Sequence, residues 1–127
     1  MRILVLGAGA IGGYYGGRLV ESGADVTFLV RERRRAALAA RGLVVKSPIG
    51  DMALPVKTIG AGEIAATFDL VLLSCKAYDL EDAMATIAPA LGRESVVLPL
   101  LNGMQHLDRL SERFGAGRIL GGACYIG

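Results

Sequence analysis

The sequence has few of the residues that build disulfides or thiol chemistry. Its 127 residues include two cysteines and a single histidine. Cys75 and Cys124 lie in apolar, strand-like segments, which favours buried reduced thiols over a disulfide or a catalytic role. His106 falls one turn into an expected helix, where a solvated or capping histidine is more typical than a proton-transfer group. These few residues give little basis for a disulfide scaffold or a cysteine nucleophile.

An excess of one charge and long apolar runs are also missing. The net charge of +2 is too small by itself to indicate a nucleic-acid partner. No apolar stretch approaches the roughly 20 residues needed to cross a bilayer. The N-terminus lacks the pattern of a signal peptide, since glycines interrupt it from Gly7 onward. We therefore expect a cytoplasmic protein that binds neither nucleic acid nor a membrane.

The N-terminus carries the pattern G-x-G-x-x-G directly after a short apolar run. Gly7 would make the tight turn out of a strand, Gly9 would allow close approach of a pyrophosphate, and Gly12 would let the following helix pack on the strand. The phosphates would sit at the N-terminus of that helix, formed by Ala10 and Ile11, where unpaired N–H groups face them. The motif therefore predicts a dinucleotide site.

Short apolar runs alternate with helical patterns along the chain, which is typical of a parallel sheet with crossover helices. We expect strands at 2–6, 25–30, 43–46, 52–56, 70–74, 95–100 and 119–126. We expect helices at 10–22, 32–40, 62–66, 80–90 and 105–114, with Gly23 and Gly42 ending the first two. The predicted fold is α/β: a Rossmann-type, doubly wound, mostly parallel sheet with helices on both faces. Residues 1–127 form one domain, with a hairpin-like insert near 43–56.

Arg31 follows the second predicted strand, where a nucleotide-binding βαβ unit meets the adenosine ribose. An acidic residue there would suit NAD or a flavin nucleotide, while an arginine can pair with the 2′-phosphate of NADP. We therefore predict NADP, with Glu32 keeping NAD open if Arg31 points away. The arginines at 33–35 fit the solvated start of a helix, although one of them could form a second wall of the phosphate pocket. They lack the interleaved aromatics of a nucleic-acid site.

Polar residues follow two later strands at the edge where ligands of open α/β sheets bind. Lys76 could donate toward a substrate carboxylate or carbonyl, and Asn102 could hold a hydroxyl or carboxamide. A surface lysine and a turn-forming asparagine fit the same positions. Tyr14 and Tyr15 fit helix packing better than stacking on a ligand, though Tyr14 is near enough to the glycines to border a cofactor.

The sequence resembles the N-terminal part of the ketopantoate reductase (2-dehydropantoate 2-reductase) family over essentially its whole length. The resemblance rests on Gly-Ala-Gly-Ala-Ile-Gly-Gly at 7–13, Arg31, Cys-Lys-Ala-Tyr-Asp at 75–79 and Leu-Asn-Gly-Met at 101–104. It implies NADPH-dependent reduction of a 2-keto acid to a 2-hydroxy acid, as in pantothenate biosynthesis. It also implies that Lys76 and Asn102 line the nicotinamide and substrate site.

The resemblance further implies a helical C-terminal domain that supplies the general acid, a lysine, and further substrate contacts. We therefore expect residues 1–127 to be the nucleotide-binding part of a longer enzyme, inactive alone. A non-catalytic module that senses a dinucleotide is the alternative, since nucleotide-binding folds also serve regulation. The sequence does not identify the true substrate. It also leaves the oligomeric state open, and a homo-oligomer is one of the alternatives.

Overall fold

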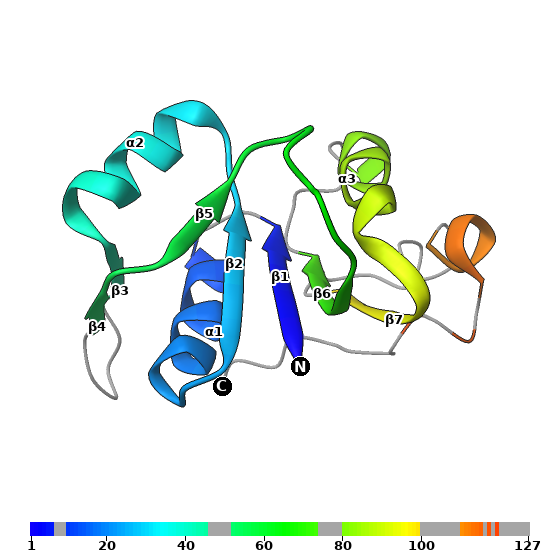
Figure 1. The fold of residues 1–127 in the computed structure, drawn as a ribbon, viewed down its shortest axis with the longest axis horizontal. Coiled ribbons are helices and arrows are strands. Elements are labelled where there is room, and N and C mark those ends of the chain that lie inside the picture. Colours follow the sequence, from blue (N-terminus) through cyan, green and yellow to red (C-terminus); the bar gives the residue numbers. More distant parts are fainter. Residues whose placement is uncertain are drawn as a thin grey trace.

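A parallel sheet of five strands forms the centre of the protein in the computed structural model (Figure 1). The structure describes residues 1–6, 10–45, 52–73, 80–99, 110–115, 117 and 119. The sheet has the order β5-β2-β1-β6-β7. Its strands are β1 (Arg2–Leu6), β2 (Asp25–Leu29), β5 (Lys57–Ile59), β6 (Phe68–Leu73) and β7 (Leu91–Pro99). The helices are α1 (Ala10–Glu21), α2 (Glu32–Arg41) and α3 (Leu80–Ile87), the last followed by a 3-10 turn, η2 (Ala88–Ala90).

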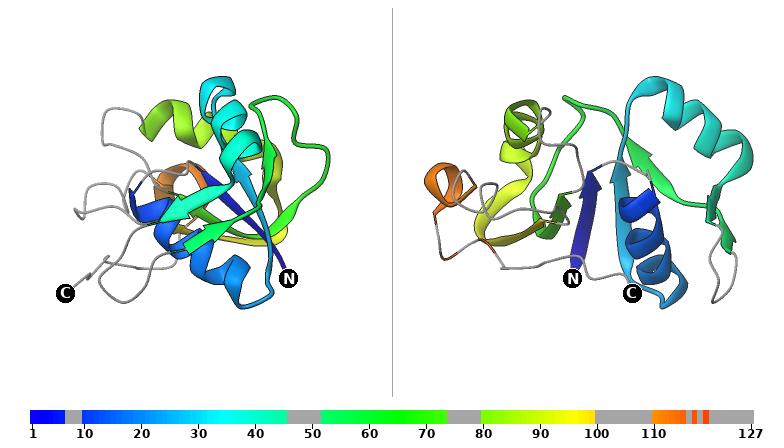
Figure 2. Two further views of the ribbon diagram at one scale, coloured as in Figure 1. Left: turned by 90° about the vertical axis from the view of Figure 1, so that its left-hand side faces the viewer. Right: turned by 180° about the vertical axis from the view of Figure 1, so that it is seen from behind.

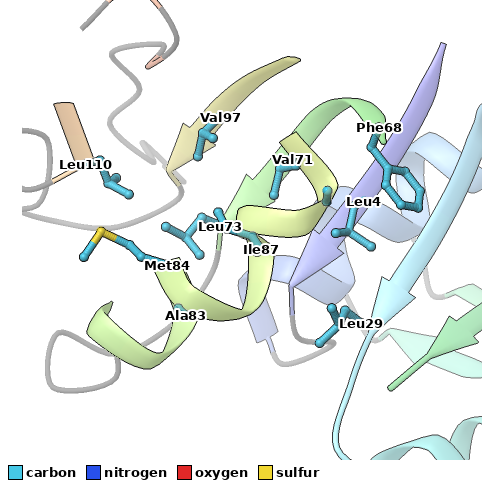
Figure 3. Packing of buried hydrophobic residues seen from close by; sticks show 11 residues of the cluster. Leu4, Leu29, Phe68, Val71, Leu73, Ala83, Met84, Ile87, Val97 and Leu110 are labelled. Carbon is cyan, nitrogen blue, oxygen red and sulfur yellow. The ribbon is translucent and has the colours of Figure 1, made fainter. Parts of the chain in front are cut away.

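Both faces of the sheet are covered, which explains why its central strands are apolar throughout. Alternate residues of β1 belong to opposite cores: Leu4 packs with α3, whereas Ile3 and Val5 pack on the face covered by α1. Figure 3 shows Met84 and Ile87 of α3 among the first set, and the reverse view in Figure 2 brings α1 in front of β2. The predicted Rossmann-type, doubly wound α/β fold is confirmed. No helix within the described ranges is long and apolar enough to span a membrane.

The two predicted helix ends are confirmed, and both use a glycine with positive φ. Gly23 has φ 92°, and its N–H donates to the carbonyl of Val20 at 3.0 Å. Gly42 has φ 71°, and its N–H donates to the carbonyl of Leu38 at 2.7 Å. This conformation is open to glycine and strained for other residues, so each position stops its helix.

The close approach of α1 to the sheet is visible at Gly16, one turn beyond the glycine that the sequence pattern singles out. A Cβ added to Gly16 would lie 2.6 Å from Cζ of Phe28 and 3.2 Å from Cγ2 of Val5. The backbone of Gly12 lies in α1, while its surroundings are outside the described part of the structure. Gly16 is therefore a packing residue that the G-x-G-x-x-G pattern does not include.

The hairpin-like insert is confirmed as a separate pair of antiparallel strands, β3 (Leu43–Val45) and β4 (Met52–Leu54). The connection between them lies outside the described residues. The strand that follows, β5, was not predicted. It pairs in parallel with β2 and forms one edge of the sheet. Three residues, Lys-Thr-Ile, are too short to show an apolar run, and their partner lies about 30 positions earlier in the sequence.

The helix predicted at 62–66 is wrong. Gly62 has φ 84° in a turn, which does not continue into a helix. The side chain of Glu63 instead accepts a hydrogen bond from the N–H of Gly60 at 2.7 Å, and Ile64 packs against the core on the α3 face. An irregular loop therefore connects β5 to β6 and covers part of the sheet in place of a crossover helix.

Both later strands begin earlier than their apolar runs suggest. β6 starts at Phe68, and β7 starts at Leu91 rather than at Ser95. The pairing shifts register between Phe68 and Leu70, and the buried Ser95 hydroxyl satisfies polar groups at this irregularity. It donates to the carbonyl of Phe68 and accepts from the N–H of Gly92. A polar residue at the bulge interrupts the apolar pattern of β7, so the sequence predicts a strand start that is too late.

The last predicted elements are only partly described. The helix expected at 80–90 is α-helical to Ile87 and then tightens into η2, where Pro89 lacks the N–H that an α-helix uses. Residues 110–114 are helical as predicted, and 105–109 lie outside the described residues. Ile119 forms an isolated parallel bridge with Val97, and the rest of the strand predicted at 119–126 lies outside as well.

An ion pair at the amino ends of β2 and β5 gives the fold a pH dependence. The ammonium group of Lys57 donates to the Asp25 carboxylate, and this bond holds the pKa of Asp25 below its ordinary value of 3.8. A carboxyl whose folded pKa is depressed stabilises the protein above that ordinary value and loses this contribution as the pH falls through the folded pKa. We expect Asp25→Asn to lower the free energy of unfolding slightly at neutral pH. The difference should vanish in acid, as measured by urea denaturation across pH.

High salt should shrink the same difference, because both side chains are about half exposed. Glu94→Gln, which removes an exposed carboxylate from β7, is the matched control. An Asp25→Asn effect that persisted unchanged in acid would contradict the assignment of the stabilisation to this pair.

Candidate functional site

The carboxyl ends of the parallel strands meet at one edge of the sheet (Figure 1). This edge is the candidate site, and we call it the binding edge. β1 ends there at Leu6, and α1 begins four residues later, at Ala10. β2 ends at the same edge, and α2 begins beside it. Ligands of open α/β sheets bind outside the carboxyl ends of the strands. The strand and the helix that flank a dinucleotide motif are therefore both present.

The structure describes only part of the predicted phosphate cradle. Ala10, Ile11 and Gly12 form the first turn of α1, and the positions of their side chains are outside the described residues. Gly7 and Gly9 lie outside as well. The first turn of α1 contains no acidic residue, so no carboxylate of that turn offsets the positive end of the helix dipole.

Lys76 and Asn102, predicted for the nicotinamide and substrate region, also lie outside the described residues. Their segments follow β6 and β7, whose last strand residues are Leu73 and Pro99. Both strands run parallel to β1, so each segment starts at the same edge as the predicted phosphate cradle. The roles of Lys76 and Asn102 remain predictions.

Arg31 stands where the sequence places it, between β2 and α2. It is exposed and caps α2 from an extended backbone conformation, φ −71° and ψ 156°, without a side-chain capping bond. Its carbonyl accepts a hydrogen bond from the N–H of Arg35 at 2.9 Å. The guanidinium is thus carried at the start of a helix, at the binding edge of the sheet. Such a group suits an anion through a planar fork of donors.

The arginines in the first half of α2 differ in exposure. Arg33 and Arg34 are exposed, in keeping with the solvated start of a helix. Arg35 is less exposed and forms an ion pair with Glu63, in which its Nη1 lies 2.5 Å from Oε1. Glu32, the acidic residue that kept NAD open, is exposed in the first turn of α2, where it complements the helix dipole.

Two residues of the loop that follows β5 and one residue of α2 form a small polar cluster. The same Glu63 oxygen that binds Arg35 accepts a hydrogen bond from the N–H of Gly60, and the N–H of Glu63 donates back to the carbonyl of Gly60 at 3.1 Å. We call Gly60, Glu63 and Arg35 the Glu63 clamp. Sequence analysis missed it, because the pair joins positions 28 residues apart and no local pattern marks it.

The two tyrosines of α1 pack as the sequence suggests. Their rings meet edge to face, with centroids 5.3 Å apart, and Tyr15 lies against the core on the α1 face. Arg18 stands over the ring of Tyr14, 5.4 Å from its centroid. Both rings are therefore engaged within α1 and its core.

Comparison with known proteins identifies the family of this chain. Residues 3–127 match the family model described as ketopantoate reductase PanE/ApbA. An uncharacterised oxidoreductase of Bacillus subtilis, YkpB, is 44% identical over 126 residues, which are 99% of this chain and 41% of that protein. The chain thus spans about two-fifths of the length of this relative.

Solved structures agree with the sequence comparison. A 2-dehydropantoate 2-reductase from Geobacter metallireducens superposes with a TM-score of 0.86 at 41% identity, covering 94% of this chain and 40% of that one. D-mandelate dehydrogenase with NADH and anilino(oxo)acetate superposes with a TM-score of 0.82 at 26% identity, covering 94% and 39%. With its fold, its binding edge and a family match over nearly every residue, this chain belongs to the ketopantoate reductase family of oxidoreductases.

Proposed function

We propose that this chain binds NADPH as the cofactor-binding part of an enzyme that reduces a 2-keto acid to a 2-hydroxy acid. The observation that carries the proposal is the exposed Arg31 at the start of α2, just beyond the carboxyl end of β2. A nucleotide in a βαβ unit places its adenosine ribose at this position. A guanidinium there favours a 2′-phosphate over a 2′-hydroxyl, because charge-assisted hydrogen bonds are the stronger kind.

The cradle for the rest of the nucleotide would come from the turn after β1 and the first turn of α1. Gly7, Gly9 and Gly12 would admit the pyrophosphate, and the N–H groups at Ala10 and Ile11 would face it. When bound, NADPH supplies the hydride for the reduction.

Lys76 and Asn102 would hold the substrate beside the nicotinamide. A lysine ammonium pairs with a carboxylate and polarises a carbonyl, while an asparagine amide both donates and accepts. Ketopantoate is the substrate that the family resemblance favours, which would place the enzyme in pantothenate biosynthesis, in the cytoplasm. The general acid would come from a second, helical domain. The relatives are long enough to contain one, because this chain covers only about two-fifths of their length.

Calorimetric titration of the purified chain tests the proposal. We expect NADPH to bind about 10- to 150-fold more tightly than NADH, the ratio that a charge-assisted bond of about 1.5–3 kcal/mol provides. We also expect no oxidation of NADPH when ketopantoate is added to this chain alone, as followed by nicotinamide absorbance.

Equal affinities for the two nucleotides would overturn the NADPH assignment. Reduction of ketopantoate by the isolated chain would show instead that its general acid lies within residues 1–127. A nucleotide sensor would be favoured if the longer protein binds the nucleotide but does not reduce a 2-keto acid, and if mutation of both Lys76 and Asn102 leaves its response to the nucleotide intact.

A further inference from the structure

The Glu63 clamp stands directly beside Arg31 at the binding edge. The ladder between β2 and β5 ends with a hydrogen bond from the N–H of Val30 to the carbonyl of Ile59, at 3.0 Å. Gly60 and Arg31 are the next residues on these two neighbouring segments. The loop after β5 therefore leaves the sheet next to the residue that we assign to the 2′-phosphate.

Arg35 brings a second guanidinium to this region. It lies one helical turn after Arg31, to whose carbonyl its N–H is bonded. Residues so spaced are neighbours on a helix, so both arginines are close to any anion at the start of α2. The Glu63 carboxylate binds the Arg35 guanidinium and offsets its charge.

The geometry around the carboxylate is specific. One oxygen of Glu63 receives both the Arg35 guanidinium and the Gly60 N–H. A Cβ added to Gly60 would lie 2.5 Å from that oxygen, so the arrangement needs a residue without a side chain at this position. The paired side chains are 34% and 47% exposed, which makes their interaction weak enough for its loss to leave the fold intact.

We propose that Glu63 is a specificity-determining residue that moderates the preference for NADPH over NADH. By holding the Arg35 guanidinium against the loop after β5, it leaves Arg31 as the principal cation for the 2′-phosphate. This role rests on the proposed function, because it acts on the same nucleotide site. Removing the carboxylate charge while keeping its size frees the charge of Arg35 and strengthens binding of the dianionic phosphate. NADH carries a hydroxyl at that position and is unaffected.

Calorimetry with NADPH and NADH on the purified parent chain, Glu63→Gln, Arg35→Ala and the double variant tests this role. Glu63→Gln is expected to raise the ratio of the Kd for NADH to the Kd for NADPH by about two- to fivefold, the range of a partly exposed charge pair. Arg35→Ala alone leaves the ratio near that of the parent, and the double variant abolishes the rise. Glu94→Gln, the same charge change on β7, leaves the ratio unchanged.

Several results of these titrations would overturn the proposed role of Glu63. A purely structural role for Glu63 would change both affinities together, and that result overturns the inference. So does a rise in the ratio that persists without Arg35, or a fall in the ratio for Arg35→Ala, which would make Arg35 itself a phosphate ligand. If the parent chain prefers NADPH and Glu63→Gln has the same ratio of affinities as the parent, this inference is refuted and the proposed function stands. A parent chain that binds neither nucleotide refutes the proposed function and this inference together.

Discussion

Replacing Arg31 with alanine is expected to weaken NADPH binding by about 10- to 150-fold while leaving NADH binding nearly unchanged. The reason is that Arg31 would contact only the 2′-phosphate, which NADH lacks, through charge-assisted bonds worth about 1.5–3 kcal/mol. Its exposed side chain makes no capping bond to α2, so its loss should not disturb the helix start. Calorimetric titration with each nucleotide measures the ratio of the two affinities, and thermal unfolding verifies that the fold is unchanged.

Two further variants sharpen the test. Arg33→Ala removes another exposed arginine two positions later and should leave the ratio close to that of the parent. Arg31→Lys keeps the charge but loses the planar fork, so an intermediate ratio is expected. If NADPH and NADH binding fell together in Arg31→Ala, Arg31 would be a general support of the site and not a reader of the phosphate.

The parts of the fold that could be predicted are those whose signal is local. β1, α1, β2 and α2 were predicted to within one residue at each end, because apolar runs covered on both faces are continuous and because glycine ends both helices. β5 escaped prediction, since a three-residue strand owes its existence to β2 alongside it. The helix predicted at 62–66 failed because the Glu63 side chain binds the backbone of its own loop.

The residues of the candidate site likewise differ in whether a local sequence pattern predicts them. The position of Arg31 follows from the end of an apolar strand, so the sequence predicts it and the structure confirms where it lies. Glu63 becomes relevant only when β5 is laid against β2 and its loop reaches α2, a tertiary fact with no local pattern. The same holds for Gly16, whose partner Phe28 comes from the neighbouring strand.

The largest loss of stability is expected from Phe28→Ala, about 3–5 kcal/mol in the free energy of unfolding. The Phe28 ring is fully buried under α1, at 0% exposure, so its removal takes apolar surface from the core and leaves a cavity. Urea denaturation followed by circular dichroism measures the change. A loss below about 1 kcal/mol would mean that α1 does not pack on Phe28 as the structure shows.

A double-mutant cycle then tests the contact between Gly16 and Phe28 itself. Gly16→Ala alone should cost about 1–3 kcal/mol, although alanine favours a helix, because its methyl group meets ring atoms of Phe28 at 2.6 and 2.7 Å. In the Phe28→Ala background those atoms are gone, so the same methyl group should cost much less and partly fill the cavity. Phe68→Ala provides the control, because Phe68 is buried on the opposite face of the sheet and its cost should add to that of Gly16→Ala within about 0.5 kcal/mol. Additive costs for Gly16→Ala and Phe28→Ala would refute the close approach of α1, and with it the tight strand–helix packing beneath the proposed phosphate cradle.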